Sequence, residues 1–103
     1  MAFTDQPLVV GDTADFTLYA KKDGVVWDIS GGTVLLYLRK PDGTVLSAFT
    51  ATISNGAGGV AHYQVADTVL DTAGDWARQW KIEKSGVELK TKIIYFSVEP
   101  ALA

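Results

Sequence analysis

Short segments in which apolar and polar residues alternate run along the whole chain, separated by clusters of Gly, Asp and Asn. Because side chains of a strand point alternately to the two faces of a sheet, this period of two predicts β-strands. No segment shows the period of an amphipathic helix. Seven or eight strands are expected, in residues 7–10, 14–22, 25–27, 33–40, 44–53, 60–65, 75–84 and 87–100.

The segment at 33–40 is apolar on both of its faces. One face carries Val34, Leu36 and Leu38, and the other carries Leu35, Tyr37 and Arg39. This pattern predicts burial on both sides of the strand or a contact surface. The turn sequence Pro-Asp-Gly at 41–43 is expected to join this strand to residues 44–53 as a hairpin.

The last predicted strand, residues 87–100, changes phase along its length. Lys90 and Lys92 have the same parity as Ile94 and Phe96, so one face would begin polar and end apolar. Since side chains alternate strictly, this change requires a bulge or a second covering layer near residues 93–94. We predict a bulge.

These patterns predict an all-β fold, an immunoglobulin-like β-sandwich of seven to eight antiparallel strands. No repeat, linker or low-complexity segment divides the sequence. Residues 1–103 are therefore predicted to form a single domain, which is an ordinary size for one hydrophobic core.

The segment at 66–76 differs from the strands around it. Asp67 is expected to cap a single helical turn over residues 68–70. The sequence Leu-Asp-Thr-Ala-Gly-Asp-Trp at 70–76 then predicts a corner that carries the chain from one sheet to the other.

Four residues are assigned to this structural corner: Asp71, Ala73, Gly74 and Trp76. The small residues Ala73 and Gly74 are expected to let the backbone pass close to the core. Trp76 is expected to enter the core, with its indole N–H available to a carbonyl of the corner, as in a tyrosine corner. Asp71 is expected to cap exposed backbone N–H groups.

Arg78 is an exception in the strand at 75–84. Strict alternation places it between Trp76 and Trp80 on the side that faces the core. Three interpretations are open: the guanidinium stacks between the two indole rings, the strand contains a bulge, or another subunit covers this face.

The composition excludes several functions. The chain of 103 residues has a net charge of −3 and no cysteine, so disulfides, thiolate catalysis and Cys-ligated zinc are ruled out. Its longest basic run is the pair Lys21 and Lys22, which predicts neither nucleic-acid nor membrane-surface binding. The N-terminus shows no signal-peptide pattern, and no segment is apolar enough to span a membrane.

No combination of residues predicts catalysis or a cofactor. The single histidine, His62, lies within a predicted strand and shares a face with Val60 and Gln64, and no serine stands in a Gly-x-Ser-x-Gly motif. The glycine-rich segment 54–59 lacks the Lys-Ser/Thr of a phosphate loop. Calcium is a weaker alternative, with two candidate pairs of ligands: Asp12 with Asp15, or Asp71 with Asp75. We expect no enzyme, no cofactor and no metal.

Seven segments, in their order along the chain, resemble the immunoglobulin-like N-terminal domains of phage baseplate upper proteins and related small tail-associated proteins of phages and prophages. They are residues 11–13 (GDT), 23–24 (DG), 28–34 (DISGGTV), 38–44 (LRKPDGT), 58–65 (GGVAHYQV), 71–76 (DTAGDW) and a final amphipathic strand. The resemblance implies a non-catalytic structural protein of the virion tail or baseplate, made in the cytoplasm of the bacterial host, whose partners are other tail and baseplate proteins.

The aromatic content predicts a contact surface. Three Trp, four Tyr and four Phe, together with the face of Leu35 and Tyr37 and the phase-shifted run at 93–98, exceed what a small sandwich needs to fill its interior. Aromatic residues are enriched at interface centres. A homo-oligomer is expected. The candidate interface residues are Tyr19, Trp27, Leu35, Tyr37 and Arg78. The alternative function is a carbohydrate-binding or adhesive module, in which Trp27 and Tyr19 would stack on sugar rings.

Overall fold

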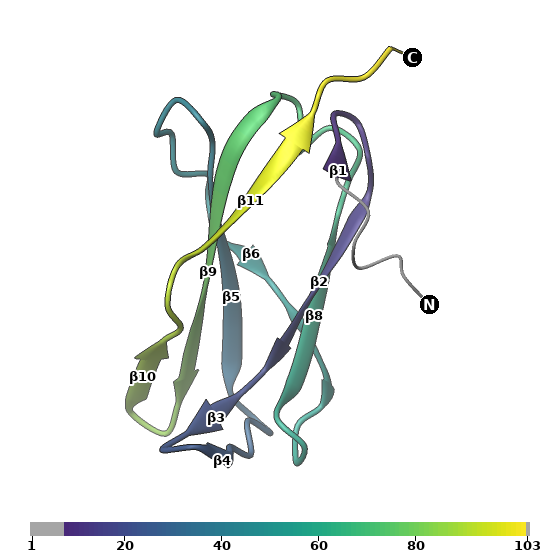
Figure 1. Ribbon diagram of the computed structural model, residues 1–103. Helices are drawn as coiled ribbons and strands as arrows, with labels where there is room; N and C mark the ends of the chain where they lie inside the picture. The colour runs from purple at the N-terminus through teal and green to yellow at the C-terminus, as the bar shows by residue number, and fades with distance from the viewer. Residues whose placement is uncertain (1–7, 103) are drawn as a thin grey trace.

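The structure, a computed structural model, describes residues 8–102 and is built from β-strands. This part of the chain contains eleven strands and no helix, which confirms the all-β prediction (Figure 1). Pro7, predicted at the start of the first strand, lies outside the described residues. The strands are β1 (Leu8–Val9), β2 (Ala14–Tyr19), β3 (Lys21–Lys22), β4 (Val25–Val26), β5 (Thr33–Arg39), β6 (Phe49–Thr50), β7 (Thr52–Asn55), β8 (Val60–Val65), β9 (Gly74–Lys84), β10 (Val87–Lys90) and β11 (Ile94–Glu99).

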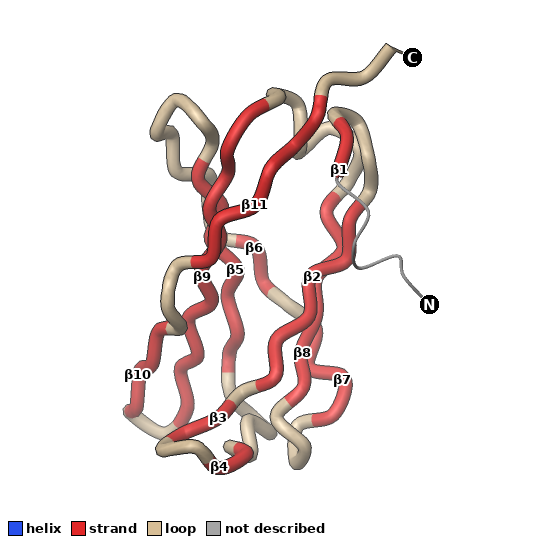
Figure 2. The backbone as a smooth tube through the Cα atoms, in the orientation of Figure 1, coloured by secondary structure: helices blue, strands red, loops and turns tan. Residues whose placement is uncertain are grey.

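Two sheets enclose the core, and Figure 2 shows them on opposite sides of the molecule. The larger sheet has the order β1-β11-β9-β5-β6, and β10 also pairs with β9. The smaller sheet has the order β2-β8-β7, while β3 and β4 form a separate hairpin at one end. This arrangement of antiparallel strands in two layers is that of a β-sandwich.

The predicted alternation holds in the strands that build the core. In β2, buried and exposed residues alternate without exception, with Phe16 and Leu18 inside. In β5, the inner face is fully buried and the outer face is partly exposed, as expected for a strand with two apolar faces. The largest fully buried side chains come from both sheets and the loops between them: Trp76, Ile29, Leu36, Leu38, Leu70, Val34, Val65 and Val98.

Three of the predicted strands are each divided into two, which explains why residues 8–102 contain eleven strands. The segment at 14–22 breaks at Ala20, and the segment at 87–100 breaks at residues 91–93. The segment at 44–53 crosses between the sheets: β6 pairs with β5, whereas β7 pairs with β8. The hairpin predicted at Pro-Asp-Gly is present as a turn, with a bridge between Arg39 and Val45.

Two further expectations were wrong. β1 runs parallel to β11, so the strands are not all antiparallel. The helical turn expected after Asp67 is a hydrogen-bonded turn instead, because the N–H of Val69 donates to the carbonyl of Ala66 at 3.1 Å and the N–H of Asp71 donates to Val69 at 3.0 Å. The second, tighter bond ends the turn before a helix can continue.

The predicted bulge in the last strand is confirmed. Both β10 and β11 pair with β9, but Lys90 is opposite Lys81 while Ile94 is opposite Arg78. Three residues, 91–93, therefore stand opposite two, and the side chains change face. Thr91 fixes the bulge: its N–H donates to the Trp80 carbonyl at 3.0 Å, and its hydroxyl accepts from the Trp80 N–H at 3.1 Å.

Candidate interaction surface

The corner before β9 is built around Trp76. Its side chain is fully buried, and its indole N–H donates to the carbonyl of Thr72 at 2.8 Å. The close approach at Gly74 differs from the expected one. Gly74 has φ +130°, and a Cβ there would meet the Pro41 ring at 3.0 Å, while Ala73 is exposed. The small residue thus makes room for the neighbouring turn and not for the core.

Asp71 makes contacts other than the predicted backbone cap. Its carboxylate pairs with the Lys40 ammonium at 2.9 Å and accepts a hydrogen bond from the Thr72 hydroxyl at 2.9 Å. The bond from Lys40, followed by that from Thr72, lowers the pKa of Asp71. The two contacts join the corner to the turn after β5.

Arg78 does not stack between the two tryptophans. Its guanidinium lies over Phe16, 5.2 Å from the ring centroid, and over Phe96 at 5.7 Å. It does face inward, as alternation predicted, because it is opposite Leu38 on one side and Ile94 on the other. Partial burial lowers the pKa of Arg78.

The five predicted interface residues do not form one surface. Leu35 and Tyr37 share the outer face of the larger sheet, whereas Tyr19, 70% exposed, lies on the outer face of the smaller sheet. Arg78 is opposite the inner residue Leu38 but also lines one hollow together with Tyr37, and Trp27 lies beyond the end of β4. Their participation in contacts with partners stays a prediction.

Trp27 is not an open stacking platform. Its side chain is half-buried and packs against the core, and the Lys22 ammonium lies 5.8 Å from its ring centroid. The carbohydrate-binding alternative depended chiefly on exposure of this ring, so the structure gives it little support.

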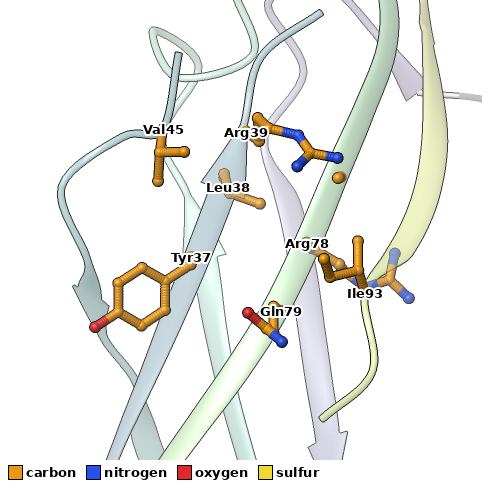
Figure 3. Close-up of a pocket in the computed structure, with 8 residues that line it drawn as sticks. Tyr37, Leu38, Arg39, Val45, Arg78, Gln79 and Ile93 are labelled. Carbon is orange, nitrogen blue, oxygen red and sulfur yellow. The ribbon is translucent and has the colours of Figure 1, made fainter. Parts of the chain in front are cut away.

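A shallow hollow lies on the larger sheet at β5 and β9 (Figure 3), and the residues that line it are Tyr37, Leu38, Arg39, Val45, Ala77, Arg78, Gln79 and Ile93. The hollow measures about 130 Å³. In the strand register, Arg39 of β5, the small and buried Ala77 of β9 and Tyr95 of β11 lie side by side. Tyr37 and Gln79 form a neighbouring pair on the same face of β5 and β9. We call this surface the tyrosine face; its members are Tyr37, Arg39, Val45, Ala77, Gln79, Ile93 and Tyr95.

Cationic side chains hold the two tyrosine rings of this face in place. The Arg39 guanidinium lies 5.8 Å from the Tyr95 ring centroid, and its Nη2 donates to the Tyr95 hydroxyl at 3.4 Å. The Lys81 ammonium lies 5.6 Å from the Tyr37 ring, and its hydrogen bond to Tyr37 raises the pKa of Lys81. Such contacts orient aromatic groups before a partner binds.

Val45 was not predicted as a surface residue, and Ile93 and Tyr95 were expected at the surface only as part of the apolar run at 93–98. Tyr95 is 67% exposed, Val45 59% and Ile93 41%. The outward orientation of Tyr95 could have been predicted, because a one-residue bulge at 91–93 places it opposite Ala77 on the outer face. Val45 and Ile93 lie in a turn and in the bulge itself, where the strand period does not apply.

The acidic residues considered for calcium have other partners. Asp12 accepts from the N–H of Val9 at 2.9 Å, Asp15 lies 3.3 Å from Nδ1 of His62, and Asp75 accepts from Ser97 at 3.2 Å. Within residues 8–102, no group of three or more His, Cys, Asp or Glu side chains is placed to hold a metal ion. The same residues include no helix that could cross a membrane.

Comparison with known proteins agrees with this architecture. The chain is similar in structure to the N-terminal domain of ORF48 of phage TP901-1, with a TM-score of 0.61 over 91% of this chain and 81% of that one. The sequences are 13% identical, so this likeness shows a shared fold. A search of curated proteins gives no match. The profile of the BppU N-terminal domain matches residues 4–103. The chain therefore belongs to the family of BppU N-terminal domains, the N-terminal domains of phage baseplate upper proteins, and has a structural role in a phage baseplate.

Proposed function

We propose that this protein is a non-catalytic assembly unit of the baseplate, and that it binds further copies of itself and neighbouring tail proteins through the tyrosine face. The observation that carries the proposal is the exposure of Val45 and Ile93 at one hollow, and of Tyr95 on β11 beside the Ala77 that lines it. Large apolar side chains that gather on an exposed sheet face are typical of contact surfaces.

The composition of the face supports this role. Tyrosine and arginine are the residue types most often found at the energetic centre of interfaces. The hollow exists because Ala77 is small and lies between the larger side chains of Arg39 and Tyr95. A space of this kind accepts one apolar side chain of a partner, which gives a contact both area and register.

The remaining parts of the proposal rest on family membership. A baseplate protein associates with other tail and baseplate proteins and is located in the virion. We further propose that it is made in the host cytoplasm and performs no reaction, in agreement with the hydrogen bonds and ion pairs that already engage the candidate acids.

Self-association is tested by sedimentation equilibrium of the wild type and of Tyr95→Asp. The wild type should form an oligomer, in which each contact buries more than roughly 1,000 Å². Tyr95→Asp should shift the equilibrium to the monomer, since it removes an exposed ring and adds an unpaired charge. Thr68→Asp, at an exposed turn on another part of the surface, is the matched control and should leave the mass unchanged. A wild type that stays monomeric at high concentration would contradict self-association.

A further inference from the structure

A second surface is formed by the free edge of β2. This strand is the outer member of the smaller sheet, and no other described strand pairs with its second side. The N–H of Ala20 donates to the Gly59 carbonyl at 2.7 Å and continues the β2–β8 register. Since hydrogen-bonding direction alternates along a strand, the peptide groups of Asp15, Thr17 and Tyr19 point away from β8. These groups are free to pair with an added strand.

The opposite sheet is open beside the same edge. β1 pairs with β11 only at Val98 and Glu99, so residues 94–97 of β11 have no described strand beside them on that side. Both strands lie at the front of the view in Figure 1. Phe16 and Phe96 meet across the two sheets with ring centroids 5.4 Å apart. Ile94 faces inward here, yet it is 40% exposed.

The inner residues of β2 show the same opening. Phe16 and Leu18 keep 6–7% of their surface exposed, whereas Leu36 and Leu38 on the central strand β5 keep none. An added strand at this edge would cover the inner side chains of β2 and Ile94 of β11.

Arg78 occupies this opening without a carboxylate partner. Its guanidinium lies beside the Phe16 and Phe96 ring pair, 5.2 Å and 5.7 Å from the two centroids, and none of the ion pairs in residues 8–102 includes it. In the described residues, the acids that form pairs are engaged by three lysines and the histidine. A partly desolvated guanidinium presents N–H donors in a plane that fits a carboxylate.

We propose that the free edge of β2 binds an extended segment of a neighbouring protein as an added strand, and that an acidic side chain of this segment pairs with Arg78. The inward side chains of the segment would be apolar on either side of the acid, because they meet Phe16 and Ile94. The backbone bonds supply affinity, and the carboxylate supplies register and selectivity. This proposal deepens the assembly role by naming a class of partner. It uses the edge of β2 in the smaller sheet, and Arg78 is the residue that it shares with the lining of the hollow at the tyrosine face.

A second copy of the chain does not fit this site. If two copies paired through β2, the inward residues brought to the opening would be Ala14, Phe16 and Leu18, none of which is acidic. Pairing about a two-fold axis would also bring the Arg78 side chains of both copies to one seam, where like charges repel. The unpaired cation thus favours an acidic segment from a different protein.

The test uses the acetylated and amidated heptapeptide Thr-Val-Thr-Glu-Thr-Val-Thr, which places Val, Glu and Val on one face of a strand. A matched peptide carries Gln in place of Glu. Binding is measured by titration of the ¹⁵N-labelled protein, followed by amide hydrogen exchange. We expect the Glu peptide to bind roughly tenfold more tightly than the Gln peptide. We also expect slower exchange at the amides of Asp15, Thr17 and Tyr19.

The variant Arg78→Met keeps apolar packing against the two phenylalanines and should abolish the preference for Glu over Gln. If Arg78→Met does not fold, as judged by circular dichroism, the proposal is tested by two wild-type results: the pattern of amide exchange and the preference for the Glu peptide. Equal binding of the two peptides, no binding by either, or exchange protection elsewhere would overturn the proposal. Tyr95→Asp should bind the Glu peptide like the wild type, so failure of the tyrosine face is distinguishable from failure of this site.

Discussion

Replacement of Trp76 by phenylalanine tests whether the corner before β9 holds the sandwich together. The variant keeps an aromatic ring against Phe96, whose centroid lies 6.3 Å from that of Trp76, but it loses the hydrogen bond to the Thr72 carbonyl. A carbonyl left without its partner in a partly buried place costs about 1–2 kcal/mol. The missing second ring leaves a cavity in the fully buried site, which costs a further ~1–2 kcal/mol.

The free energy of unfolding should therefore fall by about 2–4 kcal/mol in Trp76→Phe. Urea denaturation followed by far-UV circular dichroism measures it, because the signal does not depend on tryptophan fluorescence. Trp27→Phe is the matched control; since Trp27 is only half-buried, it should cost less than ~1 kcal/mol. A loss below ~0.5 kcal/mol in Trp76→Phe, or a larger loss in the control, would refute the reasoning.

Three further predictions concern single contacts. Gly74→Ala should destabilise the protein by about 1–3 kcal/mol more than Gly43→Ala in thermal denaturation. Both glycines have positive φ, but only a Cβ at Gly74 would meet another side chain, the Pro41 ring. Equal losses in the two variants would contradict this clash. Asp71→Asn should lower the urea midpoint at pH 7. The folded-state pKa of Asp71 lies below its unfolded value, so the higher stability of the wild type is present above about pH 4 and is lost as pH falls through the folded pKa. A lower stability of Asp71→Asn that persists in strong acid would contradict the role of the ion pair. Thr91→Val should lower the free energy of unfolding by about 1 kcal/mol and speed hydrogen exchange at the Trp80 amide, because this N–H loses its acceptor. Unchanged exchange would show that the bulge does not depend on the Thr91 hydroxyl.

Much of the fold follows from the sequence because one face of each strand must be buried. Alternation correctly placed Phe16, Leu18, Leu36 and Trp76 inside, and the change of phase in the last strand required the bulge that residues 91–93 form. These predictions succeed because a shift of one residue would expose every apolar side chain of the strand.

The sequence could not show where strands exchange partners. Residues 44–53 read as one strand, yet β6 and β7 belong to different sheets, and the crossing depends on long-range pairing that local pattern does not contain. The antiparallel sense of all strands was inferred from the number of short strands and the spacing of the turns, and it was wrong for β1, which runs parallel to β11.

The candidate surfaces were predictable only in part. Tyr37 was identified from the apolar outer face of its strand, but Val45 and Ile93 come from a turn and a bulge, where period two gives no orientation. Arg78 was recognised as exceptional from parity alone. Its contacts with Phe16 and Phe96 depend on how the two sheets face each other, which is a tertiary property.

The most direct test of the account is photo-crosslinking in assembled tails that contain the protein with benzoylphenylalanine at position 95. If the tyrosine face makes assembly contacts, irradiation should join this position to another baseplate chain or a second copy, and the same label at Thr68 should give no product. Tails in which Tyr95 gives no crosslink, or in which Thr68 crosslinks equally well, would contradict the central claim that this protein works through contacts made by the tyrosine face.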